Sequence, residues 1–60
     1  MSYELDAAIR YWAHAEELRT IAETDKLEET RQMLIHVALE YEEMARNMEQ
    51  LDARHRQSHA

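Results

Sequence analysis

Apolar residues recur along the first third of the chain at intervals of three and four, the spacing that places side chains on one face of an α-helix. This stripe consists of Leu5, Ala8, Trp12, Ala15 and Ala22, with Leu18 beside it where Arg19 interrupts the pattern. Ser2 can cap the N-terminus of such a helix, and the acids at positions 4 and 6 favour the same end. The pattern predicts a first helix over residues 3–22.

The second half of the chain carries a more regular pattern, a heptad repeat. One set of residues recurs every seven positions and a second set follows it by three: Leu27, Leu34, Tyr41 and Met48, then Thr30, Val37, Met44 and Leu51. Such a repeat predicts a long amphipathic helix, here over residues 26–54. Asp25 followed three residues later by Glu28 is typical of a capping box at the start of a helix.

A turn at residues 23–25 separates the two helices, because the heptad repeat of the second does not continue into the first. Extended backward, it would place Glu16, Thr20 and Glu23 in the seam. The predicted fold class is therefore all-α, an antiparallel two-helix hairpin that forms one domain over residues 1–54. Residues 55–60 lose the apolar period, so we expect a frayed or disordered tail there. Three acid–base pairs at i,i+4 spacing support the helices: Asp6–Arg10, Glu42–Arg46 and Asp52–Arg56.

The composition supports this fold and indicates that one copy alone does not bury enough surface to form a stable core. The 60-residue chain has no Gly, no Pro and no Cys, so neither a helix breaker nor a disulfide is available. A chain of this length buries only about 60% of the surface that its unfolded form exposes, and small domains often compensate by oligomerisation. We expect self-association, most simply as a homodimeric four-helix bundle.

The apolar positions divide into a predicted core and a predicted interface. The core comprises Leu5, Ala8, Trp12, Ala15, Leu18, Leu34, Val37, Ala38 and Tyr41. The interface comprises Ile35, Leu39, Met44, Met48 and Leu51. Ile35 and Leu39 are placed there because they fall outside the main heptad face, and exposed apolar groups in such number mark an interface.

Folding the chain back at the predicted turn gives a first estimate of which residues meet. It places Trp12 near Val37 and Tyr41, where the indole would be buried. Met48 and Leu51 then lie beyond the start of the first helix, with nothing in the same chain to cover them.

The charge of the chain limits its partners. The net charge is −6 at pH 7, which argues against nucleic acid and anionic membranes because both need clustered Lys and Arg. No apolar run approaches the roughly 20 residues of a transmembrane helix, and the first residues do not resemble a secretory signal. We expect a cytoplasmic protein whose partner is a second copy of itself, with another protein as a further possibility.

Few residues are candidates for chemistry. His14 and His36 each share a helix face with a carboxylate, as helical metal sites require. The Glu-x-x-His motif of di-iron bundles is absent, however, because Tyr11 and Met33 occupy the Glu positions. We interpret the dense acids of the second helix as a solvated face: Glu40, Glu42, Glu43 and Glu49.

The functional prediction follows from these exclusions. A phosphate-binding loop needs Gly, and two helices do not enclose a substrate pocket. We expect a non-enzymatic protein–protein interaction or regulatory module that acts as an oligomer, with no cofactor. The alternative is a bundle that binds a metal or small ligand at His and Glu sites formed on assembly.

Two groups of residues carry a resemblance. The first is Tyr11-Trp12-Ala13-His14-Ala15-Glu16-Glu17-Leu18-Arg19, and the second comprises Asp25, Arg31, Leu34, Ala38, Tyr41-Glu42 and Met44-Ala45. With them, residues 9–46 resemble a group of small bacterial proteins that carry an A-E-E-L-R helix, an Asp turn and an R-x-x-L-x-x-x-A-x-x-Y-E helix. The chain departs at Lys26, where those proteins often have Pro. The resemblance implies a helical hairpin with no known activity, so no functional residue carries over.

The predicted architecture also resembles the Rop-type plasmid copy-number regulators. Those hairpins dimerise into four-helix bundles and bind RNA, but this is a likeness of fold alone. The basic face that RNA binding needs is missing from this chain, which makes RNA binding the least favoured function.

Overall fold

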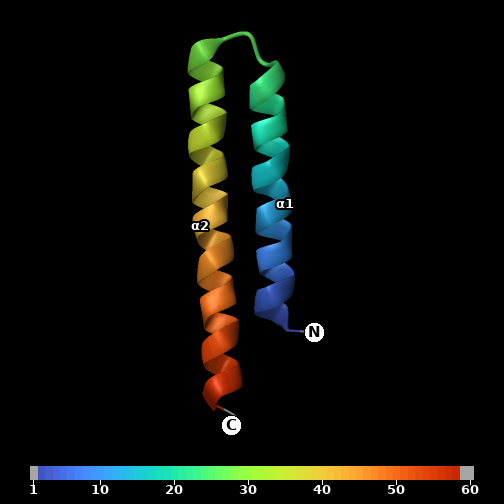
Figure 1. The fold of residues 1–60 in the computed structure, drawn as a ribbon, viewed down its shortest axis with the longest axis vertical. Coiled ribbons are helices and arrows are strands. Elements are labelled where there is room, and N and C mark those ends of the chain that lie inside the picture. Colours follow the sequence, from blue (N-terminus) through green and yellow to red (C-terminus); the bar gives the residue numbers. More distant parts are fainter. Residues whose placement is uncertain (1, 59–60) are drawn as a thin grey trace.

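The computed structural model describes residues 2–58 and consists of two long α-helices. Helix α1 spans Tyr3–Thr24 and helix α2 spans Glu28–Ser58. The helices lie side by side and run in opposite directions, and the C-terminal end of α2 extends past the start of α1 (Figure 1). The prediction of an all-α antiparallel hairpin is confirmed.

The N-terminus of α1 is capped as the sequence predicts. The Ser2 hydroxyl oxygen accepts a hydrogen bond from the Leu5 N–H at 3.0 Å, which satisfies one of the free donors in the first turn. Asp6 and Arg10 form the predicted i,i+4 ion pair at 3.2 Å, with both side chains more than half exposed. The pair therefore supports the helix only slightly.

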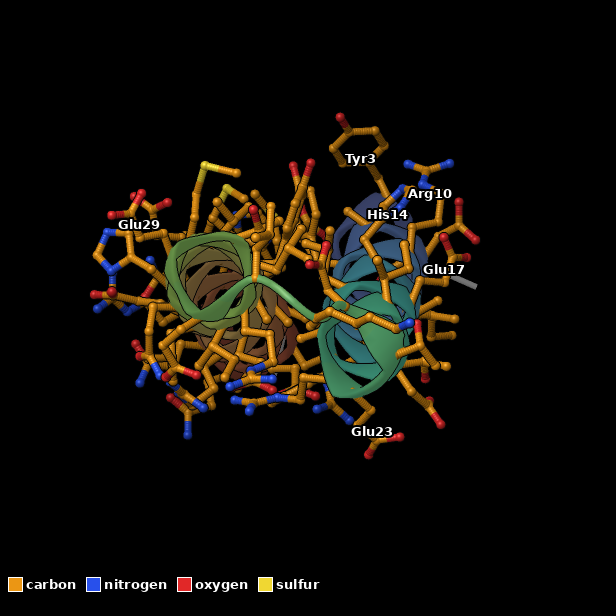
Figure 2. All side chains as sticks on the ribbon, turned by 90° about the horizontal axis from the view of Figure 1, so that it is seen from above. Tyr3, Arg10, His14, Glu17, Glu23 and Glu29 are labelled. Carbon is orange, nitrogen blue, oxygen red and sulfur yellow. The ribbon has the colours of Figure 1, made fainter. Side chains whose placement is uncertain are left out.

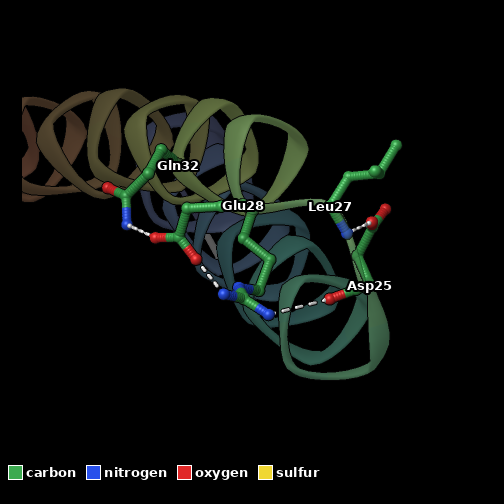
Figure 3. Close-up of polar contacts among 5 residues, drawn as sticks. Asp25, Leu27, Glu28 and Gln32 are labelled. Carbon is green, nitrogen blue, oxygen red and sulfur yellow. Dashed lines mark hydrogen bonds and ion pairs between the residues drawn. The ribbon is translucent and has the colours of Figure 1, made fainter.

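The connection between the helices lies at residues 25–27, later than the predicted 23–25, because α1 continues through Thr24. Asp25 has an extended backbone (φ −79°, ψ 133°), which any residue can adopt, so the turn needs no glycine. The Asp25 carboxylate accepts a hydrogen bond from the Leu27 N–H at 2.8 Å (Figure 3).

The capping box predicted for Asp25 and Glu28 is wrong. Asp25 closes the end of α1, and two further residues precede α2, so its side chain does not reach the first turn of α2. The Glu28 carboxylate instead accepts from Gln32 at 3.0 Å and pairs with Arg31. Arg31 also donates to the Asp25 carbonyl oxygen at 3.2 Å (Figure 3), which ties α2 to the turn.

The predicted frayed tail is also wrong over residues 55–58, because α2 remains helical to Ser58. Two polar contacts lie at this end: His55 Nδ1 is 3.1 Å from the Glu4 carboxylate of α1, and Arg56 is 2.9 Å from the Asp52 carboxylate. Residues 59 and 60, the rest of the expected tail, lie outside the described residues.

The two helices meet along a seam of alanines. Ala8, Ala15 and Ala22 of α1 and Ala38 and Ala45 of α2 recur every seven residues, and each is at most 3% exposed. A spacing of seven keeps side chains on one face of a helix, and small side chains let two helices approach closely. The seam therefore forms the contact that positions everything else in the hairpin.

The larger residues of the predicted core are not fully buried. The half-buried ones line the edges of the alanine seam: Leu5, Leu18, Leu34, Val37 and Tyr41. Among residues 2–58, no large side chain is buried to the degree that the alanines are. The extents of the Cα trace are 51 × 16 × 10 Å, so the hairpin is a single layer, whereas folded domains have at least two packed layers.

Within the described part of the chain, neither α1 nor α2 combines the length and the apolar character that crossing a membrane requires.

Candidate functional site: an apolar helical face

The alanine seam divides the hairpin into two broad faces of different character. Figure 2, a view along the helices, shows Tyr3 and His14 pointing to one side of the layer and Glu23 to the other. The methionine sulfur atoms visible in this view lie on the side of Tyr3 and His14. The two faces therefore differ in what they offer a partner.

The first face, which we call the aromatic–methionine face, combines apolar residues from both helices. It comprises Tyr3, Tyr11, His14, Leu18 and Ile21 of α1 and Met33, Leu34, Val37, Tyr41, Met44, Met48 and Leu51 of α2. Tyr41 is at its centre, with ring centroids 6.0 Å from Tyr11 and 5.4 Å from His14. A shallow depression lies next to these rings and is lined in part by Val37 and Met44. This face offers rings and thioethers that adapt to a partner.

Several side chains of this face are exposed to a degree unusual for their size. Tyr3 is 75% exposed, Met33 59% and Ile21 50%. Tyr3 lies at the start of α1, whereas Ile21 and Met33 lie near the turn. Large exposed apolar side chains in such number are typical of interaction surfaces. The depression beside Tyr41 is also lined by Glu40, Glu43 and Asn47, so a partner that docks there must leave both carboxylates in water or pair them.

The opposite face, the arginine–glutamate face, is organised by ion pairs. It comprises Trp12, Arg19, Ile35, Leu39, Glu42, Arg46 and Glu49. Arg19 donates two hydrogen bonds to the Glu42 carboxylate, each 2.9 Å long, in the bidentate arrangement that suits a guanidinium. These bonds lower the pKa of the Glu42 carboxyl and raise the pKa of the Arg19 guanidinium. The Glu42 carboxylate binds Arg19 of α1, and Arg46, its predicted i,i+4 partner, contributes only a smaller favourable charge interaction that also lowers the Glu42 pKa.

Trp12 belongs to this second face and not to the core in which it was predicted. Its ring is 36% exposed, and its indole N–H donates to Glu49 at 3.1 Å. The Arg46 guanidinium lies 5.8 Å from the ring centre, within range of a cation–π interaction. Glu49 is about two turns further along α2 than Tyr41, so folding the chain at residue 24 gave the wrong register.

The observed register of the helices also changes where two of the predicted interface residues lie relative to α1. Because Glu4 pairs with His55, α1 runs alongside α2 as far as residue 55. Met48 and Leu51 therefore lie beside α1, with Met48 half-buried and Leu51 37% exposed. The expectation that both extend beyond the first helix is wrong.

The five predicted interface residues do not form one patch. Met44, Met48 and Leu51 lie on the aromatic–methionine face, whereas Ile35 and Leu39 lie on the arginine–glutamate face. Ile35 borders a depression that Arg19 and Arg31 also line, so its surroundings are charged. An interface that uses one face leaves the other group of residues outside it.

Asp52 is the buried polar residue that the sequence pattern missed. It follows Ala38 and Ala45 at the next heptad position and is 2% exposed. Trp12 meets Glu49 and Glu4 meets His55, so Asp52, between those two contacts, faces the first turns of α1. Arg56 lies 2.9 Å from its Oδ2, which is an ion pair without the alignment of a hydrogen bond. The heptad spacing could have revealed this burial.

The remaining candidates for chemistry do not converge. His14 stacks near Tyr41, while His36 is exposed on the outer side of α2. Across residues 2–58, no three His, Cys, Asp or Glu side chains are grouped closely enough to hold a metal ion. Of the acids predicted to form a solvated face, Glu40 and Glu43 are exposed, whereas Glu42 and Glu49 bind Arg19 and Trp12.

Comparison with known proteins adds no assignment. No protein-family model matches the chain, and the searches of curated proteins and of solved structures gave no significant match.

Proposed function

We propose that this protein is a small non-enzymatic protein–protein interaction module that acts as a homo-oligomer, most simply a dimer, through the aromatic–methionine face. The observation that supports the proposal best is that the hairpin is one layer in which, among residues 2–58, only alanines and Asp52 are buried. A second layer placed on the aromatic–methionine face would bury Leu18, Leu34, Tyr41 and Met48, the half-buried residues beside the seam. The result would be a four-helix bundle core.

The exposed area supports this proposal quantitatively. The hairpin exposes 4768 Å². A compact monomer of 7.2 kDa exposes about 4,100 Å² by the usual scaling with mass. The excess, about 650 Å², approaches the roughly 800 Å² that each partner buries in a standard protein interface. One copy thus exposes more surface than a compact monomer of its mass, as its elongated single layer implies.

The chemistry of the two faces supports a binding role over catalysis. The surface depressions are shallow and open, and one of them is lined by Glu16, Glu17 and Thr20 with two apolar neighbours. Enzyme pockets enclose most of their substrate. On the arginine–glutamate face, Arg19 is already neutralised by Glu42, and Arg46 lies against Trp12. That face is less suited to RNA, which needs cations free to contact phosphate.

Two matched double variants test which face assembles. Met44→Glu with Leu51→Glu adds two charges to the aromatic–methionine face, and Ile35→Glu with Leu39→Glu adds two to the opposite face. The first pair should reduce the mass in sedimentation equilibrium to that of one chain, while the second should leave a dimer. The reverse outcome would move the interface to the arginine–glutamate face. Dimers from both variants would contradict assembly through either face.

A further inference from the structure

Charged residues border the aromatic–methionine face and bear on how a second copy would be oriented there. In one orientation, related by a two-fold axis, acids of one copy would lie next to bases of the other. On the outer edge of α1, Arg10 precedes His14 by four residues and Glu17 follows it by three. Figure 2 shows these three side chains on the outer side of α1, with His14 directed out of the layer. All three are exposed, and Arg10 also lies 3.2 Å from Asp6 of its own helix in an ion pair whose side chains are both more than half exposed. A second copy of α1, run antiparallel and centred near His14, would place each Arg10 next to Glu17 of the other copy.

Helix α2 shows the same arrangement at longer range. Tyr41 marks the level of His14, since their rings are 5.4 Å apart. Glu29 lies twelve residues before Tyr41, and Arg54 lies thirteen residues after it. Glu29 is at the outer edge of α2 in Figure 2, and Arg54 borders a depression with Leu51. An antiparallel second copy of α2, centred near Tyr41, would therefore place each Arg54 next to Glu29 of the other copy.

We propose that two copies pair through the aromatic–methionine face with their turns at opposite ends, α1 against α1 and α2 against α2, about a two-fold axis near His14 and Tyr41. This orientation rests on the proposed function, which requires a dimer. The partner that covers the aromatic–methionine face is a second copy of this chain. Both members of each complementary charge pair belong to the same chain, as a self-complementary two-fold contact requires. Paired edge charges of this kind select orientation in helical bundles.

The alternative orientation, with both turns at the same end and α1 over α2, is disfavoured by charge. The turn segment 23–29 contains four acids and one lysine, and this orientation would bring two such segments together. It would also bring Glu17 near the level of Glu40. In the antiparallel orientation each acidic turn lies instead beside the end of α2 that carries Arg54 and Arg56. The opposite end of the hairpin carries acids and bases in nearly equal number and is therefore less acidic than the turn. This difference favours turns at opposite ends.

Disulfide cross-linking tests the orientation, because the chain has no cysteine of its own. His14→Cys places the new thiol near the proposed axis, so mild oxidation should link two copies of the full chain. Ile21→Cys is the matched control on the same face of α1. Seven residues from the axis, its two copies would be about 21 Å apart along the helices, beyond the roughly 7 Å between Cα atoms that a disulfide spans. It should not cross-link.

The outcomes separate this inference from the proposed function. Sedimentation of the reduced variants reports whether a dimer exists, independently of its orientation. A dimer in which His14→Cys does not self-link, but links to a tagged Met44→Cys chain, would overturn the antiparallel orientation and keep the dimer. Reduced variants and wild type that are all monomeric would overturn the proposed function itself.

A charge-reversal cycle gives a second readout that needs no cysteine. Glu29→Arg and Arg54→Glu should each weaken dimerisation by roughly tenfold at low salt, since each turns two attractions into two repulsions. The double variant exchanges the charges and should restore the wild-type dissociation constant. Losses that simply add in the double variant would contradict the contact between Glu29 and Arg54.

Discussion

Replacement of Ala45 by leucine perturbs the contact on which the whole hairpin depends. Ala45 is fully buried in the alanine seam. It lies between Glu42, which binds Arg19, and Glu49, which binds Trp12, so the buried Ala15 of α1 is near its level. A leucine there adds three carbon atoms at a point of closest approach between two backbones. The helices must move apart locally or the leucine must adopt a strained rotamer.

The magnitude follows from the packing of the seam. Additional methylene groups in a well-packed core cost about 1–3 kcal/mol, and a domain of this size rarely has more than about 3–5 kcal/mol of stability. Ala45→Leu should therefore remove a large fraction of the free energy of unfolding. For a chain of 60 residues, each kcal/mol lowers Tm by about 4–8 °C. Ala38 lies about 10 Å further along the seam, so the losses of stability from Ala38→Leu and Ala45→Leu should add. The double variant should therefore leave little folded protein.

Urea unfolding followed by circular dichroism measures the effect, at one fixed protein concentration because assembly would make stability concentration-dependent. Ala13→Leu is the matched control, because Ala13 is exposed on α1 and outside the aromatic–methionine face. It should change the free energy of unfolding by only a few tenths of a kcal/mol. If Ala45→Leu were as stable as Ala13→Leu, the close contact along the alanine seam would be refuted.

Three further predictions concern single polar contacts. Glu42→Gln should melt below wild type at pH 7, and the gap should close on acidification: the Glu42 pKa is lowered from its ordinary 4.5, so its contribution is present at neutral pH and lost as pH falls through the folded-state pKa. An equal gap at pH 7 and about pH 3 would contradict the role of Arg19. Trp12→Phe, which removes the exposed bond to Glu49, should cost no more than about 1 kcal/mol in urea, whereas a loss of 3 kcal/mol would indicate a buried indole. Asp52→Ala removes a buried carboxylate and should leave stability unchanged or raise it by about 1 kcal/mol, and a clear drop in Tm would show that its ion pair stabilises the fold.

The local structure of this protein could be predicted because its causes are local. The three-four spacing in α1 and the heptads in α2 are read directly from the chain, and so is the Ser2 cap. The end of α1 was placed two residues early because no Gly or Pro marks it. The tail was predicted to fray because its apolar period ends, whereas α2 remains helical to Ser58 and its last turns contact Glu4 and Asp52 through His55 and Arg56.

The packing could be predicted only in part, because it depends on which helix edge meets which. Large residues such as Trp12 were expected to form the core, although the alanines at heptad spacing were visible in both segments. In a hairpin of two helices the closest contact belongs to the smallest side chains, and larger ones are displaced to its edges. Whether an edge residue such as Trp12 lies with Tyr41 or with Glu49 depends on the register, which the turn and cross-helix bonds determine.

The candidate site, like the packing, could be predicted only in part. Met44, Met48 and Leu51 were identified from sequence, and the helix geometry places them on the same side of the seam as Tyr41. Ile35 and Leu39 were grouped with them because both sets lie off the main stripe. The structure separates the two sets, since the edges of α2 on either side of the seam face opposite directions.

Sedimentation equilibrium of the wild-type chain at micromolar concentrations tests whether a second copy covers the aromatic–methionine face. The proposal predicts a particle of twice the 7.2 kDa chain mass, which dissociates on dilution while its helical circular dichroism signal weakens. A helical particle with the mass of a single chain at every concentration up to about 100 micromolar would contradict the proposal. A dimer with a standard interface has a dissociation constant below that concentration.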